Sequence, residues 1–395
     1  MRSFDALMRL TLLALPVFAS GELLPVKRAE GEVLKDSYVV VLKDGYNVAN
    51  VADSMPDMNI THRWTILNGF AATLDEEGLD KLRADPDVLS ISENAAARTS
   101  AIQTDAPWGL QRISHREPVE PKNDLALTYT YIYDDSAGGG VDVYVIDTGI
   151  QVDHPEFNGR ARWGITFGGY PDMDGNGHGT HCAGTVGSLH FGVSKAVNLI
   201  AVKVLGDDGF GWWSDIISGI DWVATTAAST GRPSVVSMSI QGGAYDPVDE
   251  AVTNLVNSGV PASVAAGNFA EDAQFVSPGR TPSAITVGAM DINDNMASFS
   301  DYGTLVDIFA PGVNVWSTWI GSTTNLDSGT SMATPHVAGF VAYLYGLDSS
   351  LTVAAIEAAI DCYATRDALT LTDAAIQAGT ANKLLYNNYQ DNQHW

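Results

Sequence analysis

The chain has 395 residues, 45% of them hydrophobic and 17% charged, which allows one large and one small domain with a sizeable core. Its formal net charge is −26, and after residue 100 there are 32 acidic residues against 11 basic ones. Such an excess of negative charge argues against nucleic acid and anionic membranes as partners. The two cysteines, Cys182 and Cys362, are too few for a disulfide framework.

An apolar segment at the N-terminus indicates a secretion signal. Two arginines flank its start, and the apolar run from Leu10 to Ala19 is too short to cross a bilayer as a helix. Small residues place the cleavage site after Ala19 or, alternatively, after Gly21. We therefore predict a signal peptide over residues 1–19 and an extracellular protein, with a vacuolar one as the alternative. No later apolar run reaches the length of a membrane helix, so no membrane partner is expected.

Residues 20–100 predict a small α+β unit. Apolar and β-branched runs predict three strands, at residues 38–42, 68–74 and 88–92. A helix is predicted at residues 76–82. Residues 95–100, mostly small residues with no strand or helix pattern, are expected to form an exposed linker. A segment of that kind is a favourable place for proteolytic cleavage.

The remaining chain, residues 101–395, alternates buried-strand patterns with helical ones. The predicted strands are residues 141–147, 199–205, 235–240, 262–268 and 285–289, and the predicted helices include 214–224, 247–258 and 337–344. Strands that alternate with helices favour a mostly parallel sheet that is covered on both faces. The expected fold class is therefore α/β, with three α/β/α layers.

Two polar residues stand in Gly-rich surroundings early in this region. Asp147 ends the first predicted strand, and ligands in open α/β sheets bind beyond the carboxyl ends of strands. His178 lies between two glycines, which allow other backbone to approach its ring. Alternative interpretations are a capping aspartate and a zinc site of His178 with His181. Zinc proteases, however, place two histidines four residues apart with a glutamate between them, and this chain has neither feature.

Ser331 precedes a long apolar helical run. Gly329 permits a tight turn before it, and Pro335 is a residue that helices accept near their start. Ser331 is therefore expected at a helix N-terminus, where free N–H groups favour negative charge. This position suits a serine that attacks an acyl carbon and creates an oxyanion beside itself. The alternative is that Ser331 is only the N-cap of the helix.

Together these residues make a familiar catalytic set. A serine nucleophile needs a neutral histidine to accept its proton and a buried carboxylate to orient that histidine. The chain offers Asp147, His178 and Ser331 for these roles. Asn268, at the end of the fourth predicted strand, offers a side-chain N–H to an oxyanion.

Three sequence motifs carry a resemblance to subtilisin-type serine proteases: Asp-Thr-Gly at 147–149, His-Gly-Thr-His at 178–181 and Gly-Thr-Ser-Met-Ala-Thr-Pro-His at 329–336. Within that family the chain resembles the proteinase K-like branch. The resemblance covers nearly all of residues 101–395 and rests further on Ala106–Leu110, His181–Thr185 and Tyr386–Tyr389. It implies a subtilisin-like catalytic domain behind a ferredoxin-like inhibitory propeptide.

The resemblance also implies roles for individual residues. Ser331 would attack the peptide carbonyl, His178 would act as base and then acid, Asp147 would fix the tautomer of the ring, and Asn268 would stabilise the oxyanion. An extended substrate would lie between two segments that include Gly209, Gly211, Trp213, Ser239, Ile240, Gln241 and Gly242. Gln241 departs from the family, which has glycine there. The expected preference at the residue before the cleaved bond (P1) is broad, apolar or aromatic.

Further expectations follow from the same resemblance. Catalysis needs no cofactor, whereas a structural Ca²⁺ would bind to Asp307 and to the carbonyls of Pro282 and Ala284. Both cysteines would be free, with Cys182 buried near the active site. The protein would act on protein or peptide substrates as a monomer, bind neither nucleic acid nor membrane, and be inhibited by its own propeptide until self-cleavage near Ser100. Two rival functions are a metallohydrolase and a catalytically silent binding protein.

Overall fold

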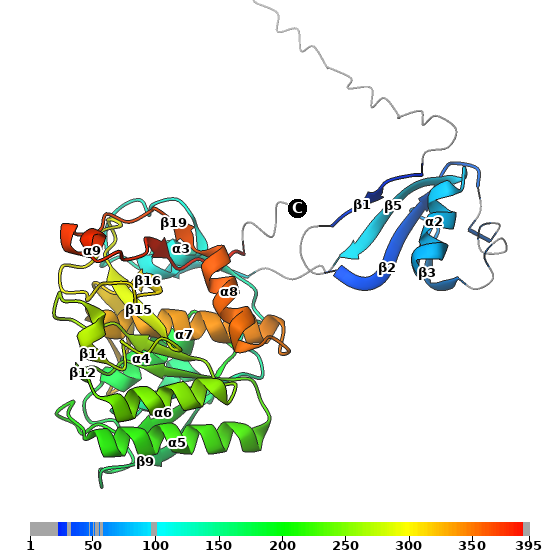
Figure 1. Ribbon diagram of the computed structural model, residues 1–395. Helices are drawn as coiled ribbons and strands as arrows, with labels where there is room; N and C mark the ends of the chain where they lie inside the picture. Colours follow the sequence, from blue (N-terminus) through cyan, green and yellow to red (C-terminus); the bar gives the residue numbers. More distant parts are fainter. Residues whose placement is uncertain are drawn as a thin grey trace, which may run out of the picture. The chain divides into compact units, whose positions relative to one another are not determined.

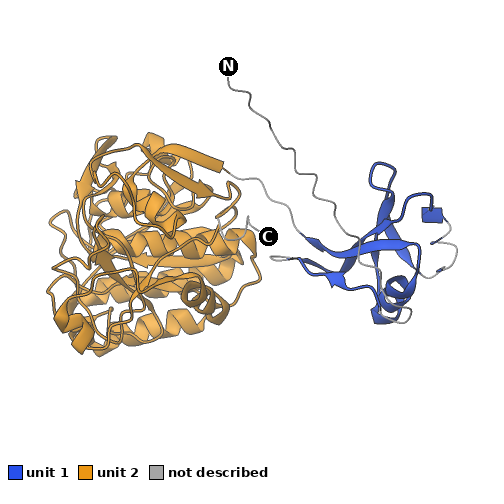
Figure 2. Ribbon diagram, turned by 90° about the horizontal axis from the view of Figure 1, so that it is seen from above, with its two compact units in different colours: residues 1–98, 394–395 blue, residues 99–393 orange. Residues whose placement is uncertain are grey.

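The protein is described by a computed structural model that covers residues 23–29, 33–46, 48–49, 51, 55, 58–95 and 101–389. The chain forms two compact units, one within residues 1–98 and one within residues 99–393 (Figure 2). The predicted signal peptide and the predicted cleavage site at Ser100 lie outside the described residues. The exact domain boundaries therefore remain predictions.

The N-terminal unit is a twisted sheet with a helix against it. The strand order is β1-β5-β2-β4-β3, and all neighbours are antiparallel except β1 and β5. Val40, Phe70 and Ile91 are fully buried in its core. The order β5-β2-β4-β3 confirms the predicted ferredoxin-like fold. The elements are β1 (Val26–Lys27), β2 (Val33–Leu42), β3 (Asn59–Trp64), β4 (Gly69–Thr73), α2 (Glu76–Ala84) and β5 (Val88–Ala95).

A nine-stranded sheet forms the centre of the second unit (Figure 1). Every pair of neighbours is parallel except β19 and β20 at one edge. Across the sheet the strands are β19 (Thr365–Arg366), β20 (Lys383–Leu384), β16 (Ile308–Pro311), β15 (Ile285–Met290), β13 (Ala262–Ala265), β11 (Ser234–Met238), β8 (Asp142–Asp147), β10 (Asn198–Lys203) and β9 (Ala161–Thr166).

Helices cover both faces of this sheet, as the pattern predicts. Val143 and Val145 of β8 pack in one apolar cluster with α4 (His178–Gly187) and α7 (Thr330–Leu347). Tyr144 and Ile146 point the other way and pack with α5 (Trp213–Thr230) and α6 (Asp246–Asn257), which lie side by side in Figure 1. Successive strand residues face opposite sides, so burial of both sets fixes the three layers.

Shorter elements complete the second unit. Three two-stranded pairs join β6 to β7, β12 to β14 and β17 to β18. No helix among the described residues is long and apolar enough to cross a membrane. The elements are β6 (Ala101–Ala106), α3 (Trp108–Ser114), β7 (Tyr129–Tyr133), η1 (Pro155–Phe157), β12 (Gly242–Gly243), η2 (Ala273–Phe275), β14 (Val276–Ser277), β17 (Val315–Trp319), β18 (Thr323–Asp327), α8 (Val353–Tyr363) and α9 (Asp373–Gln377).

Candidate active site

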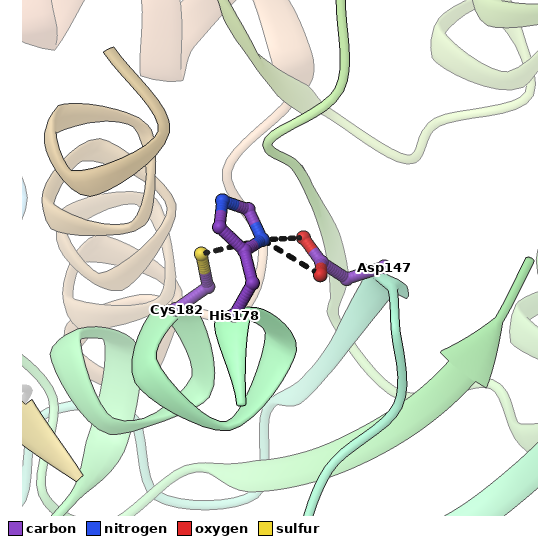
Figure 3. Close-up of side chains that lie close together, drawn as sticks. All are labelled: Asp147, His178 and Cys182. Atoms are coloured by element: carbon purple, nitrogen blue, oxygen red, sulfur yellow. Dashed lines mark hydrogen bonds and ion pairs between the residues drawn. The ribbon is translucent and has the colours of Figure 1, made fainter. Parts of the chain in front are cut away.

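Asp147 and His178 meet at the carboxyl end of the central strand β8. Asp147 is the last residue of β8 and is fully buried, and His178 is the first residue of α4. The Nδ1 atom of His178 lies 2.8 Å from Oδ1 and 3.0 Å from Oδ2 of Asp147 (Figure 3). Both oxygens therefore hold one ring nitrogen, which fixes the orientation of the imidazole.

Glycines make this approach possible. Gly177 is the N-cap of α4 with a φ angle of 108°, a conformation that side chains disfavour. A Cβ atom on Gly179 would lie 2.1 Å from the carbonyl oxygen of Gly149. Any larger residue at 179 would thus push α4 away from the segment that follows Asp147.

A second buried carboxylate, Asp174, braces both partners. Its Oδ1 accepts hydrogen bonds from the Thr148 hydroxyl at 2.9 Å and from the backbone N–H of Gly177 at 2.9 Å. Its Oδ2 accepts from the backbone N–H and the hydroxyl of Thr180, at 3.0 and 2.6 Å. One side chain therefore ties the residue after Asp147 to the start of the helix that carries His178. The sequence motifs did not single out Asp174, although its place just before the glycines that precede His178 was the available signal.

Ser331 lies in the first turn of α7, whose N-cap is Gly329. The interpretation of Ser331 as an N-cap is therefore wrong. The helix also begins at Thr330, before the predicted start at Val337, and encloses Pro335. Proline has no N–H to donate, so the carbonyl oxygen of Ser331, one helical turn earlier, lacks its helical partner. The Ser239 hydroxyl, at 2.8 Å, and the Cys182 thiol, at 3.4 Å, donate to it instead.

The hydroxyl of Ser331 donates a hydrogen bond of 3.4 Å to the backbone oxygen of Ser239. Among the described residues it makes no hydrogen bond to His178. Bonds of this kind are commonly long before substrate binds and tighten in the complex. The two residues share a neighbour, since Cys182 Sγ is 4.0 Å from the Nδ1 atom of His178 and 3.4 Å from the carbonyl oxygen of Ser331.

The environment shifts the pKa values of His178 and Cys182 upward. Burial is the largest single influence and lowers the pKa of His178, but the Asp147 carboxylate, with a further contribution from Cys182, outweighs it and raises that pKa well above the ordinary 6.5. Burial raises the pKa of the Cys182 thiol. Cys182 therefore stays protonated at neutral pH, which makes it a packing residue and not a nucleophile.

The zinc alternative finds no support in this geometry. The Nε2 atom of His181 lies 2.9 Å from the carbonyl oxygen of Val315, and burial lowers the pKa of His181 to about 4. Among the described residues, the one group of three or more His, Cys, Asp or Glu side chains whose ligand atoms lie close together is Asp147, His178 and Cys182. That group excludes His181 and includes a thiol that burial keeps protonated.

Asn268 follows β13 and is held by the start of α7. Its Oδ1 accepts hydrogen bonds from the backbone N–H of Thr330 at 2.8 Å and from the Thr330 hydroxyl at 3.0 Å. Its Nδ2 donates to Oε1 of Gln241 at 3.1 Å. The amide donor of Asn268 therefore faces away from α7.

A cleft of about 570 Å³ opens beside His178 and contains all seven predicted substrate residues, Gly209, Gly211, Trp213, Ser239, Ile240, Gln241 and Gly242. Two of the glycines are needed for space: a Cβ atom on Gly211 would lie 2.5 Å from the carbonyl oxygen of Val204, and one on Gly242 would lie 2.6 Å from the Trp213 ring. Trp213 stacks on Tyr245 with ring centroids 5.8 Å apart. Phe210 and Trp212, within the predicted segment 209–213, also line the cleft, together with Thr148 of the Asp-Thr-Gly motif and with Asn176, Leu205 and Ile216, which were not predicted.

Comparison with known proteins decides the family. The Subtilase family model matches residues 138–383, and the Peptidase inhibitor I9 model matches residues 57–100. The chain belongs to the subtilase family. Proteinase R of Parengyodontium album is 47% identical over 93% of this chain and 92% of its own. Alkaline serine protease ver112 of Corniculantispora psalliotae is 45% identical over 95% of this chain and 96% of its own. A cold-adapted subtilisin-like serine proteinase of known structure has a TM-score of 0.65 and 42% identity, covering 72% of this chain and 98% of that one.

These matches place this subtilase on the proteinase K-like branch. It is a subtilisin-like serine protease that carries an I9 inhibitor propeptide. The predicted fold class, enzyme class and zymogen organisation are thus confirmed. Its two cysteines are free thiols, Cys182 buried and Cys362 exposed, as the resemblance implies.

The three predicted calcium ligands of this subtilase, Pro282, Ala284 and Asp307, line one small cavity of about 130 Å³. Asp307 uses Oδ2 to accept a hydrogen bond from the backbone N–H of Thr286 at 2.8 Å, which leaves Oδ1 for a cation. Burial raises the pKa of Asp307 to about 6 although nearby Lys383 lowers it, so its carboxylate lacks full charge compensation. One carboxylate with two carbonyls is a hard oxygen donor set that fits Ca²⁺.

Proposed function

We propose that this subtilase is a secreted serine endopeptidase that cleaves peptide bonds in proteins through an acyl-enzyme. Ser331 is the nucleophile, His178 the general base and then acid, and Asp147 the residue that orients His178. The observation that carries the proposal is the pair of 2.8 and 3.0 Å contacts between Asp147 and His178, beside a cleft and the helix of Ser331. An intact set of this kind favours catalysis over a silent binding protein.

Each residue has a defined part in the proton transfers. Asp147 holds the proton of His178 on Nδ1, which leaves Nε2 free to accept the proton of the Ser331 hydroxyl. The oxygen of Ser331 then bonds to the substrate carbonyl carbon, and His178 returns the proton to the departing amine. A water molecule, activated by His178 in the same way, then attacks the acyl-enzyme, and the carboxylic acid product leaves as Ser331 regains its proton. Asn268 Nδ2 and the backbone N–H of Ser331, in the first turn of α7, stabilise the oxyanion.

The cleft supports an extended peptide as substrate. Residues 209–213 and 237–242 would lie on its two sides and pair with its backbone as added strands. Ile240 and Trp213 give the cleft an apolar lining, which supports the broad apolar or aromatic P1 preference. The strongly acidic charge agrees with a secreted monomer, and vacuolar delivery is the alternative.

The I9 match supports an intramolecular inhibitor in residues 20–100. We propose that the enzyme cuts its own chain near Ser100 and Ala101, and that the mature enzyme spans residues 101–395. The propeptide would block the cleft until it is removed.

The pH profile of the mature enzyme tests the histidine base. Only neutral His178 accepts a proton, and Asp147 raises the pKa of His178 well above 6.5. The expected kcat/KM on a peptide amide therefore rises through neutral pH and levels off only in the alkaline range. The relative from Corniculantispora psalliotae is named an alkaline protease, which agrees with this expectation. A flat profile between about pH 5 and about pH 9 would contradict a histidine base.

Calcium is expected to stabilise the fold and to take no part in the reaction. A ligand present at about 100 times its Kd stabilises the native state by about 2.7 kcal/mol, which corresponds to a Tm increase of several degrees for a domain of this size. Differential scanning calorimetry with Ca²⁺ and with EDTA measures this shift. Asp307→Asn should abolish it, whereas the exposed Asp367→Asn should retain it. A Ca²⁺-dependent Tm that persists in Asp307→Asn would place the ion elsewhere.

A further inference from the structure

The oxyanion donor of the resting enzyme is already occupied. Asn268 Nδ2 donates to Gln241 Oε1 at 3.1 Å. The assignment of the two amides follows from the network, because Asn268 Oδ1 accepts two hydrogen bonds from Thr330 and its N–H group must face the other way. Gln241 must then present its oxygen, since its nitrogen cannot accept.

The Gln241 oxygen approaches this donor from the substrate side. Gln241 lines the cleft together with His178 and Ile240, whereas Thr330 is buried beneath Asn268 at the start of α7. Thr330 alone fixes the Asn268 amide through two hydrogen bonds. The contact with Gln241 is therefore not needed for orientation, and it gives the Asn268 donor an acceptor from a residue that lines the cleft.

The nucleophile is engaged by the same short segment. The Ser331 hydroxyl donates to the backbone oxygen of Ser239 at 3.4 Å, two residues before Gln241. Residues 239–241 thus hold both groups that the proposed reaction needs, the attacking hydroxyl and the oxyanion donor. A glycine at position 241 would offer no side-chain acceptor for the second contact.

We propose that residues 239–241 form a resting-state latch, in which Gln241 competes with the substrate carbonyl oxygen for the Asn268 donor. This inference rests on the proposed function, because it requires Asn268 to serve the oxyanion. The substrate must displace Gln241 Oε1 before the oxyanion forms. The latch therefore lowers kcat/KM by the same factor for every substrate, whatever its P1 side chain.

The test compares Gln241→Ala with Gln241→Met in the mature enzyme. Met retains the length and bulk of Gln but has no amide oxygen. Both variants should raise kcat/KM on peptide amides by about three- to tenfold. They should also increase the binding affinity for a peptide aldehyde inhibitor by the same factor, because its adduct places an oxyanion in the site. The gain should be equal for substrates with Ala, Leu and Phe at P1. A gain in Gln241→Ala alone, or one limited to bulky P1 residues, would mean simple steric narrowing and would overturn the latch.

A double-mutant cycle with Asn268→Ala supplies the decisive comparison. Wild-type enzyme fixed to a resin can remove the propeptide of these variants and then be filtered away. In the Asn268→Ala background, the Gln241 substitutions should give no gain in aldehyde affinity. A gain that persists there, or a loss of kcat in Gln241→Met, would overturn the inference. If the wild-type chain neither hydrolyses peptides nor binds the aldehyde, the proposed function fails and the latch fails with it. If the wild type does both and the Gln241 variants do not improve, the latch alone fails.

Discussion

Ser331→Ala is expected to yield a secreted chain that keeps its propeptide and hydrolyses no protein. The substitution removes the oxygen that bonds to the substrate carbon, and in subtilisin, another subtilase, the corresponding loss is about 2 × 10⁶ in kcat. Because we propose that maturation is autocatalytic, the chain should begin near residue 20 and not at Ala101. Intact mass spectrometry and a casein assay measure the two effects.

The matched control is Ser328→Ala, in the same loop but exposed and outside the cleft. It should mature and hydrolyse casein normally. Normal removal of the propeptide from a pure Ser331→Ala preparation would show that another enzyme processes the chain. Retained hydrolysis would mean that Ser331 is not the nucleophile.

Asp147→Asn is expected to lower kcat by about 10⁴, the magnitude found for the equivalent change in a serine protease of another fold. The Asn amide keeps the shape of the side chain, but it accepts with one oxygen only and carries no charge. The His178 ring is then free to adopt the wrong tautomer. Burial, which lowers the pKa of His178, would also act without the opposing carboxylate. The residual activity should therefore extend to lower pH than that of the wild type.

Asp172→Asn provides the comparison for this prediction. Asp172 is an exposed carboxylate in the segment before His178, and its hydrogen bond comes from the Thr166 hydroxyl. The pH profile and kcat of this variant should match those of the wild type. An unchanged kcat in Asp147→Asn would show that Asp147 has no part in the mechanism. If its activity were lost at the same pH as that of the wild type, the carboxylate would not set the pKa of His178.

Much of the fold follows from local patterns. The buried strands β8, β10, β11, β13 and β15 match their predicted positions to within a few residues, since each is an apolar run that packs on both faces. The strands β9, β16, β19 and β20 at the sides of the sheet were not predicted. They are short or alternate in polarity, and only pairing with a neighbouring strand makes them regular.

The start of α7 shows why one boundary was wrong. Local sequence alone favours a proline in the first turn of a helix, yet Pro335 lies inside α7. Ser239 and Cys182, which are distant in the sequence, compensate for its missing N–H by donating to the carbonyl oxygen of Ser331. No local pattern contains that information.

In the candidate site, too, some features follow from local sequence and others depend on tertiary contacts. Asp147, His178, Ser331 and Asn268 could be named because the sequence places each in a distinct Gly-rich or strand-end setting. The bracing by Asp174 and the contact of Gln241 with Asn268 depend on side chains brought together only by folding. The residues that we propose to contact the reacting atoms could thus be named from the sequence, whereas the residues that hold them in place could not.

The identity of the nucleophile is the central claim, and labelling tests it most directly. The purified mature protein is treated with a serine-directed phosphonylating inhibitor, and intact mass and peptide mapping locate the adduct. We predict one adduct per chain, on Ser331, with complete loss of hydrolysis and with no labelling of Ser331→Ala. An unlabelled protein that still hydrolyses casein, or an adduct on another residue, would contradict the account.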